Sequence, residues 1–264
     1  MWVRSTGARC FGNRALGLDP ALQTATFMRM TQPVLIVAHG QPSDPGPAAA
    51  ALEGLSAKVA VLLPGRIVRA ATLAEPGAIA RAASGLPGGL VFPMFMTGGW
   101  FTRVQIPAKL AEAGAVGWTV LEPFGCDNAV HDLCVTQVRE MAAREVILAA
   151  HGSFKSTVPS DIARHVGARI VTETGARVAV GFIDEAPQLS SLTGFGTVCL
   201  PFFAAEGGHV TDDIPAALAL AGFQGRILPA IGLDDRVPAL VASAIASGVP
   251  VCTGICRWAR GQNT

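Results

Sequence analysis

The 264 residues of this chain include no tyrosine, and they are poor in charged side chains and aromatic rings. Charged residues form 15 % of the chain, against about a quarter in an average protein, and aromatic residues form 6 %. The formal net charge is only +1. A protein that binds nucleic acid usually presents a basic face with stacking rings, so this composition argues against that class. Small molecules or ions are the expected partners.

The chain also lacks a sustained apolar run, although its mean hydropathy is +0.44. Its longest uncharged stretches, 82–102 and 237–256, are interrupted repeatedly by glycine and proline. A membrane-spanning helix needs about 20 consecutive apolar residues, so we expect no contact with a membrane and a cytoplasmic location.

No secretion signal precedes the six cysteines, which are scattered along the chain. This pattern predicts free thiols in a reducing compartment. The spacing of Cys252 and Cys256 is too weak a signal for a metal site, and we interpret the pair as core residues.

Residues 1–29 differ from the rest, because they hold four arginines and a single acid, Asp19. A buried strand is predicted immediately after Met30, which favours translation from Met28 or Met30; a transit peptide is the alternative. Without these residues the chain has 20 − 4 = 16 basic and 19 − 1 = 18 acidic side chains, a net charge of −2.

The remaining chain repeats itself. Residues 34–40 (VLIVAHG) are echoed by 146–152 (VILAAHG), and residues 91–100 (VFPMFMTGGW) by 199–209 (CLPFFAAEGGH). The two offsets, 112 and 109, agree closely. We therefore predict two similar halves, 30–144 and 145–264.

Apolar strands alternate with helices in both halves, which predicts two doubly wound α/β/α domains with parallel sheets and a cleft between them. In the second half we expect strands at 145–150, 169–172, 177–182, 197–203, 225–228 and 249–253, and helices at 160–167, 216–221 and 237–246.

Three histidines are expected at the carboxyl ends of strands, where ligands bind in such sheets. His39 and His151 directly follow predicted strands, and His209 follows Gly207-Gly208, which we expect to form a tight bend. A single histidine of this kind is usually a packing residue. Three in equivalent places favour a site.

Acidic residues accompany these histidines. Asp184 and Glu185 follow the strand at 177–182, and Glu75 is the nearest acid in the first half. Two imidazoles and a carboxylate suit Co²⁺, Fe²⁺, Ni²⁺ or Zn²⁺. The alternative is that Asp184 caps a helix and Glu185 lies in its first turn.

Three motifs of the second half together resemble a known family. They are His-Gly-Ser after a strand, Phe-Ile-Asp-Glu-Ala-Pro, and Leu-Pro-Phe-Phe-x-x-x-Gly-Gly-His-Val-x-x-Asp-Ile-Pro. This combination resembles the sirohydrochlorin cobaltochelatases and ferrochelatases, class II tetrapyrrole chelatases whose long members are internally duplicated. The resemblance covers the chain from about Met30. It implies insertion of Co²⁺ or Fe²⁺ into sirohydrochlorin for cobalamin or sirohaem, with the metal ion as substrate and no organic cofactor.

Carried over residue by residue, the resemblance makes His151 and His209 the catalytic, metal-binding pair and Asp184 a metal-contacting acid. In the first half His39 matches the first family histidine, but Trp100 replaces the second, and Glu75 matches the acid only approximately. We therefore expect the working site in the second half.

The substrate is rich in carboxylates, so hydrogen-bond donors should line its site. The candidates are Ser153, Lys155, Arg103 and the Gly207-Gly208 turn, with Trp100 stacking on the macrocycle. The alternative for both charged side chains is a solvated loop end, and for Trp100 a packing role.

Two other functions stay open. The loss of one histidine at Trp100 fits a non-catalytic protein that binds a metal or a tetrapyrrole. A hydrolase using His-Gly-Ser is disfavoured, because the sequence has no phosphate-binding loop and no Gly-x-Ser-x-Gly elbow. Internal duplication supplies both walls of a cleft, so a monomer suffices.

Overall fold

The computed structural model of the chain describes residues 31–254 and 256–258. The expected extension at 1–29, including Cys10 and the predicted start site, lies outside these residues.

The fold contains two four-stranded sheets in which every strand pair is parallel, as predicted. The first sheet has the order β2-β1-β3-β4, with β1 (Val34–Ala38), β2 (Val68–Thr72), β3 (Gly89–Pro93) and β4 (Trp118–Val120). The second has the corresponding order β6-β5-β7-β8, with β5 (Glu145–Ala150), β6 (Arg177–Phe182), β7 (Val198–Pro201) and β8 (Arg226–Ile227).

Helices connect the strands in the same sequence in both halves. The α-helices are α2 (Pro45–Leu62), α3 (Ala78–Ala83), α4 (Ile106–Glu112), α5 (Asn128–Glu140), α6 (Val158–Thr174), α7 (Ile214–Leu220) and α8 (Val237–Ser247). Short turns of helix are η1 (Phe101–Gln105), η2 (Phe124–Cys126), η3 (Leu189–Ser191), η4 (His209–Asp213) and η5 (Ile231–Leu233). Five of the α-helices begin with proline in their first turn, where the missing N–H costs no hydrogen bond.

Two expected strands of the second half are wrong. Residues 169–172 belong to α6, because Ile162, Val166 and Ile170 recur every four residues on one buried face and the helix continues to a left-handed Gly175. Residues 249–253 form only an isolated bridge, in which Pro250 lies opposite Leu121.

The central strands are buried on both faces, which explains why charge is scarce in them. In β1, Val34 and Ile36 face one cluster of apolar side chains while Leu35 and Val37 face another. Alternate residues of a strand point to opposite faces, so helices must cover each sheet on both sides. In β5, likewise, Leu148 faces one cluster of apolar side chains while Ile147 and Ala149 face another.

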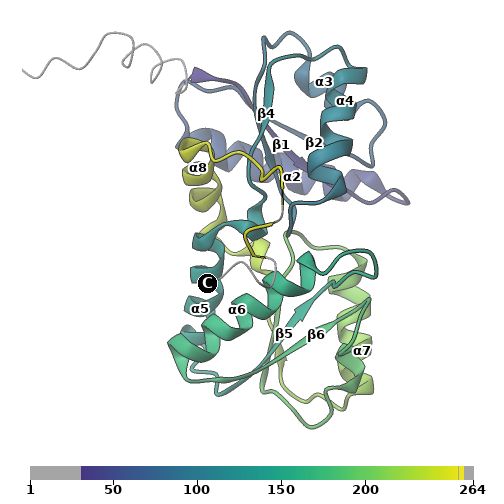
Figure 1. The fold of residues 1–264 in the computed structure, drawn as a ribbon, viewed down its shortest axis with the longest axis vertical. Helices are drawn as coiled ribbons and strands as arrows, with labels where there is room; N and C mark the ends of the chain where they lie inside the picture. Colours follow the sequence, from purple (N-terminus) through teal and green to yellow (C-terminus); the bar gives the residue numbers. More distant parts are fainter. Residues whose placement is uncertain (1–30, 255, 259–264) are drawn as a thin grey trace, which may run out of the picture.

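The last helix of each half packs against the other half (Figure 1). Helix α8 lies against α2 and β3 of the first lobe, and α5 lies against α6 of the second lobe. The predicted boundary between residues 144 and 145 describes the repeat in the sequence. In the folded chain, α5 of the first half packs on the second lobe and α8 of the second half packs on the first lobe.

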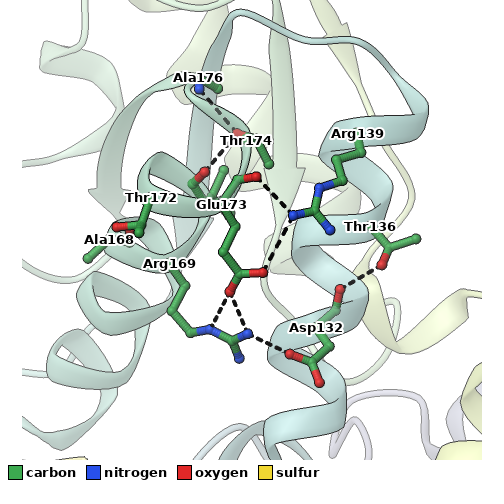
Figure 2. A network of polar contacts seen from close by, with 10 residues as sticks. Asp132, Thr136, Arg139, Ala168, Arg169, Thr172, Glu173, Thr174 and Ala176 are labelled. Carbon is green, nitrogen blue, oxygen red and sulfur yellow. Dashed lines mark hydrogen bonds and ion pairs between the residues drawn. The ribbon is translucent and has the colours of Figure 1, made fainter.

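A network of ions holds α5 against α6 (Figure 2). Arg169 on α6 donates to Asp132 on α5 at 2.6 Å and to Glu173 at 2.6 Å. Arg139 on α5 donates to the Glu173 carbonyl at 2.8 Å. Since Arg169 contacts both Asp132 and Glu173, and Glu173 also contacts Arg139, the network links the two helices at more than one point.

The exchanged helices join the two lobes into one core. A single cluster of buried apolar side chains includes Phe92 of β3, Leu133 of α5, Ile170 of α6 and Ile245 of α8. Among the described residues, no helix is both long and apolar enough to cross a membrane.

This shared core predicts that the lobes unfold together. Replacing fully buried Ile245 by alanine should lower the free energy of unfolding by about 2–5 kcal/mol, because it leaves a cavity in the common cluster. Urea unfolding followed by circular dichroism should show one transition at lower urea. The control Leu220→Ala removes a side chain that is 79 % exposed and should change stability by less than about 0.5 kcal/mol. A second transition that stays at the original midpoint would contradict the shared core.

His131 on α5 makes stability depend on pH. Burial lowers the pKa of its imidazole to about 4, while Nε2 donates to the Gly125 carbonyl at 2.9 Å and Nδ1 has no partner. The unfolded chain binds this proton near pH 6.5, so stability should fall by about 3 kcal/mol as pH decreases from 6.5 to 4. Urea unfolding across this range checks the slope. His131→Gln, which retains a donor but does not titrate, should reduce the slope; an unchanged slope would show that His131 is not its source.

Candidate functional site

His151 and His209 meet at the carboxyl edge of the second sheet. His151 directly follows β5 and His209 begins η4 after β7, and these two strands are neighbours in the sheet. Their Nε2 atoms are 3.2 Å apart, with ring planes at 87° to each other. Both side chains are nearly half exposed, at 44 % and 47 %, so a ligand can reach the nitrogens.

The outer nitrogens of both rings are held by oxygen atoms. His209 Nδ1 donates to Asp213 Oδ2 at 2.7 Å. His151 Nδ1 donates to the Gly152 carbonyl at 3.1 Å, and Asp184 Oδ2 lies 3.3 Å from the same nitrogen. Oxygen acceptors on this side place the protons on Nδ1, so both Nε2 atoms present lone pairs.

Two lone pairs that face each other favour a cation or a proton between them. With metal–nitrogen bonds of about 2.1 Å, nitrogens 3.2 Å apart subtend an angle of about 100° at the ion. That angle is near the one found in tetrahedral and octahedral sites. The pair can therefore offer two ligands to a borderline metal ion and leave its other positions free.

Asp184 lies behind His151, next to Nδ1, rather than beside the two Nε2 atoms. Within residues 31–254 and 256–258, no three His, Cys, Asp or Glu side chains are grouped so as to hold a metal. In this geometry Asp184 is placed to orient the His151 imidazole from its Nδ1 side.

Glu185 shapes the loop that carries His151. Its Oε2 accepts the Ser153 amide at 2.9 Å, and its Oε1 pairs with Arg164 at 3.3 Å. Gly152 has a φ of +73°, and a Cβ there would lie 2.7 Å from Glu185 Cγ. The alternative that Asp184 caps a helix and Glu185 lies in its first turn is wrong, because the next helical turn, η3, starts at Leu189.

The Gly207-Gly208 turn is open. The chain bends at Gly207, as expected, and the helical turn begins at Gly208 with ordinary helical angles of −50° and −36°, so the bend needs no positive φ at either glycine. A Cβ at Gly207 would meet nothing within 4 Å. The pair therefore leaves free space beside His209.

Ser153 and Lys155 lie on the loop after His151. The Lys155 amide donates to Ser153 Oγ at 3.1 Å, and the Lys155 residue is exposed. Between them is Phe154, which is 83 % exposed. The sequence analysis did not single out this apolar ring, although its place beside the histidine motif was visible.

Within the described part of the first lobe, His39 has no corresponding histidine partner. His39 Nδ1 donates to the Gly40 carbonyl at 2.9 Å, and its ring contacts Phe101 at 4.8 Å between centroids. Glu75 is ion-paired with Arg81. Thus neither His39 nor Glu75 meets a second metal-binding side chain in these contacts.

Trp100 and Arg103 differ in their surroundings. The Trp100 side chain is 61 % exposed and contacts Phe101. Arg103 donates to Cys252 Sγ at 2.9 Å and to the Gly254 carbonyl at 3.1 Å, so its guanidinium already holds the C-terminal segment.

Asp213 also belongs to the site, although the sequence analysis named only Asp184, Glu185 and Glu75 as candidate acids. It was visible as an acid four residues after His209, a spacing that places two side chains on the same face of a helical turn.

Comparisons with known proteins identify the family and the fold of this chain. The family model described as CbiX matches residues 145–247. The structure titled CbiX, the terminal enzyme for biosynthesis of siroheme in denitrifying bacteria, is 43 % identical, with a TM-score of 0.77, and the match covers 83 % of this chain and all of that one. No curated protein sequence matches the chain.

Two more distant structures share the fold. SirB from Bacillus subtilis with Fe³⁺ is 14 % identical, with a TM-score of 0.66 over 83 % of this chain and 96 % of that one. DR2241 from Deinococcus radiodurans, a multi-domain protein similar to chelatases, is 17 % identical, with a TM-score of 0.57 over 82 % of this chain and 55 % of that one.

Asp213 should strengthen metal binding through His209. Asp213→Asn removes the charge that fixes the imidazole proton on Nδ1, and we expect Co²⁺ affinity to fall about 10–100-fold. Titration with Co²⁺ followed by calorimetry measures the change. Asp212→Asn is the matched control, because it removes the adjacent acid while His209 keeps its partner; equal losses in both variants would argue for a general charge effect.

Proposed function

The chain belongs to the CbiX family of class II tetrapyrrole chelatases, and we propose that it inserts Co²⁺ or Fe²⁺ into sirohydrochlorin. The main observation in support is that the Nε2 atoms of His151 and His209 lie 3.2 Å apart at the exposed carboxyl edge of the second sheet. The 43 % identity to the siroheme-biosynthesis enzyme over that protein's full length supports the same reaction.

The reaction needs a metal donor and a proton acceptor on the same side of the macrocycle. Two pyrrole N–H protons must leave as the ion binds the four ring nitrogens. His209 and His151 hold the incoming ion through Nε2, and after the ion moves off their lone pairs His209 accepts one ring proton and His151 accepts the other. Asp213 stabilises the resulting imidazolium from Nδ1, and Asp184 lies in the same position behind His151.

The macrocycle is proposed to lie over the open side of this pair. Gly207 and Gly208 leave room for a flat ligand beside His209, and exposed Trp100 offers an aromatic face from the first lobe. Lys155 and Ser153 are proposed to bind substrate carboxylates. Arg103 is less suited to that role, because it already donates to Cys252 and Gly254.

The same reaction also bears on the role of the metal, the need for a cofactor and the oligomeric state of the protein. The metal ion is a substrate, and no organic cofactor is required for an exchange of two protons for one ion. One chain supplies both lobes, so we propose a monomer acting in the cytoplasm. His and carboxylate groups accept several borderline ions, so metal availability decides between Co²⁺ and Fe²⁺.

His209→Ala should reduce metal insertion at least about 100-fold, because it removes a metal donor and the base together. The absorbance of sirohydrochlorin is followed after addition of Co²⁺ or Fe²⁺, with the uncatalysed rate subtracted. His39→Ala should retain activity within about threefold, since its ring contacts Phe101 rather than a second histidine.

The same assay separates the proposal from a non-catalytic carrier, the alternative favoured by Trp100 in place of a histidine. Acceleration by the unaltered chain supports the enzyme. Tight binding of sirohydrochlorin without acceleration would overturn it in favour of a carrier, and near-normal insertion by His209→Ala would overturn the assignment of the base.

A further inference from the structure

A hollow of about 470 Å³ follows the outer edge of the first sheet. It runs along β2, which is the edge strand of that sheet and pairs only with β1 among the described residues. Helices α2 and α3 pack on opposite faces of β2 and form the two sides of the hollow. Its polar lining residues are Glu53, Ser56, Arg69, Thr72, Glu75 and Arg81. A volume of this size is typical of ligand sites, and the histidine pair lies on the other sheet.

The second lobe covers the corresponding edge with its own chain. The residue before each repeated histidine pairs with Thr72 in the first sheet and with Phe182 in the second, so these two residues are equivalent. The Phe182 amide donates to the Pro187 carbonyl at 2.9 Å, and Phe182 forms a parallel bridge with Gln188. An extended segment of polypeptide therefore adds to the edge of the second sheet.

Thr72 leaves the same position open in the first lobe. The residue is only 1 % exposed, and its Oγ1 makes no hydrogen bond within the described part of the chain. No described segment bridges to the outer side of β2. The Thr72 N–H therefore faces the hollow, as the equivalent N–H of Phe182 faces Pro187. Buried polar groups are normally hydrogen-bonded, so this edge favours an occupant that supplies acceptors.

Side chains on both faces of β2 are also smaller than their counterparts. In the second lobe the fully buried ring of Phe182 fills one face of the edge strand, and buried Leu189 fills the other. The first lobe has Thr72 on the first face, and Ala78 and Ala82 line the hollow on the second. Alternate residues of an extended strand point to opposite faces, so apolar side chains of an added strand would fill both places.

Arg69 gives the α3 side of the hollow an affinity for a carboxylate. Its Nη1 donates to the carbonyl oxygens of Ala82 and Ser84, both at 2.9 Å, while its Nη2 and Nε bond no described residue. Arg81, in contrast, is already ion-paired with Glu75. A guanidinium binds a carboxylate well through two N–H groups. The exposed Glu53 lies on α2, so we expect the acidic group of a ligand on the α3 side.

We propose that this hollow binds an extended, acidic and apolar peptide segment of another protein, which adds to the edge of the first sheet. A main-chain carbonyl of the peptide accepts the Thr72 N–H, and a second oxygen accepts the Thr72 hydroxyl. A carboxylate side chain binds Nη2 and Nε of Arg69. In such strand addition, main-chain hydrogen bonds provide affinity and side-chain pockets provide specificity. This inference goes beyond the proposed metal insertion and does not depend on it.

The probe is a fluorescein-labelled synthetic peptide with the sequence of residues 184–192, DEAPQLSSL, which contains the segment that covers the equivalent edge. Added to the full chain, it should give a saturable rise in fluorescence anisotropy and slow hydrogen exchange in residues 68–72. The matched control peptide NQAPQLSSL lacks both carboxylates. It should bind about 10-fold more weakly, because it loses the charged bond to Arg69.

Thr72→Phe should abolish binding of the peptide, because a ring at this position fills the hollow as Phe182 does in the second lobe. The matched control is Thr119→Phe, which adds the same ring to exposed Thr119 on β4, the other edge strand of the sheet. It should bind the peptide as the unaltered chain does. Circular dichroism shows whether each variant is folded.

Three results would overturn the proposal. One is the absence of saturable binding by the unaltered chain, which depends on no variant. Another is equal affinity for the acidic and the neutral peptide together with unchanged binding by folded Thr72→Phe. The third is complete competition by acetate at the concentration of the peptide, which would identify a small-anion site instead of a peptide groove.

Discussion

Parallel strands with both faces buried impose the main constraint on this molecule, because each sheet needs a complete cover of helices on either side. The chain meets this requirement by exchanging α5 and α8 between the lobes. Burial of Ile245 in the same cluster as Phe92, and of Leu133 with Ile170, makes the two cores continuous. The relative position of the lobes is therefore determined by packing of the shared core. Ion pairs and hydrogen bonds among Asp132, Arg139, Arg169 and Glu173 also hold α5 against α6.

The order of strands in the second sheet determines which polar groups meet. Strand β5 is paired with β7 on one side and with β6 on the other. The loops after these three strands accordingly bring His151, His209 and Asp184 to one edge. The first sheet has the same order, yet the corresponding edge carries His39, Trp100 and Glu75. The difference between the lobes thus lies in side-chain chemistry and not in the backbone arrangement.

Much of this could be predicted from the sequence, because the signals are local. Apolar runs located β5, β6 and β7, and the repeated His-Gly and Gly-Gly-His patterns indicated the histidine pair. The true length of α6 was missed because Ile170, Val171 and Thr172 are consecutive β-branched residues, which favour a strand when the preceding helix period is ignored. Asp213 and Asp184 needed coordinates, since the atom that each carboxylate contacts depends on how its ring is turned.

Long-range features could not be predicted in this way. The residues of α5 and α8 predict an apolar face on each helix, but they do not indicate that this face packs against the other lobe. Likewise, Cys126 is separated from Arg257 and Trp258 by the entire second sheet, so the hydrogen bonds of these two residues to its carbonyl appear only after both lobes are packed. These cases share one cause. A contact between two distant segments depends on both of them, whereas hydrophobic periodicity and residue spacing describe only one segment at a time.

The exchange of helices also has a consequence for synthesis on the ribosome. Strand β4 ends at Val120, but α8 begins at Val237, so 237 − 120 = 117 residues separate the first sheet from its final covering helix. At about 5–20 residues per second, the nascent first lobe waits roughly 6–25 s before that helix emerges. During this interval part of its apolar face is open to solvent and to other chains. The first lobe to be made is thus the last to be completed, because the helix that covers it is the last described helix of the chain.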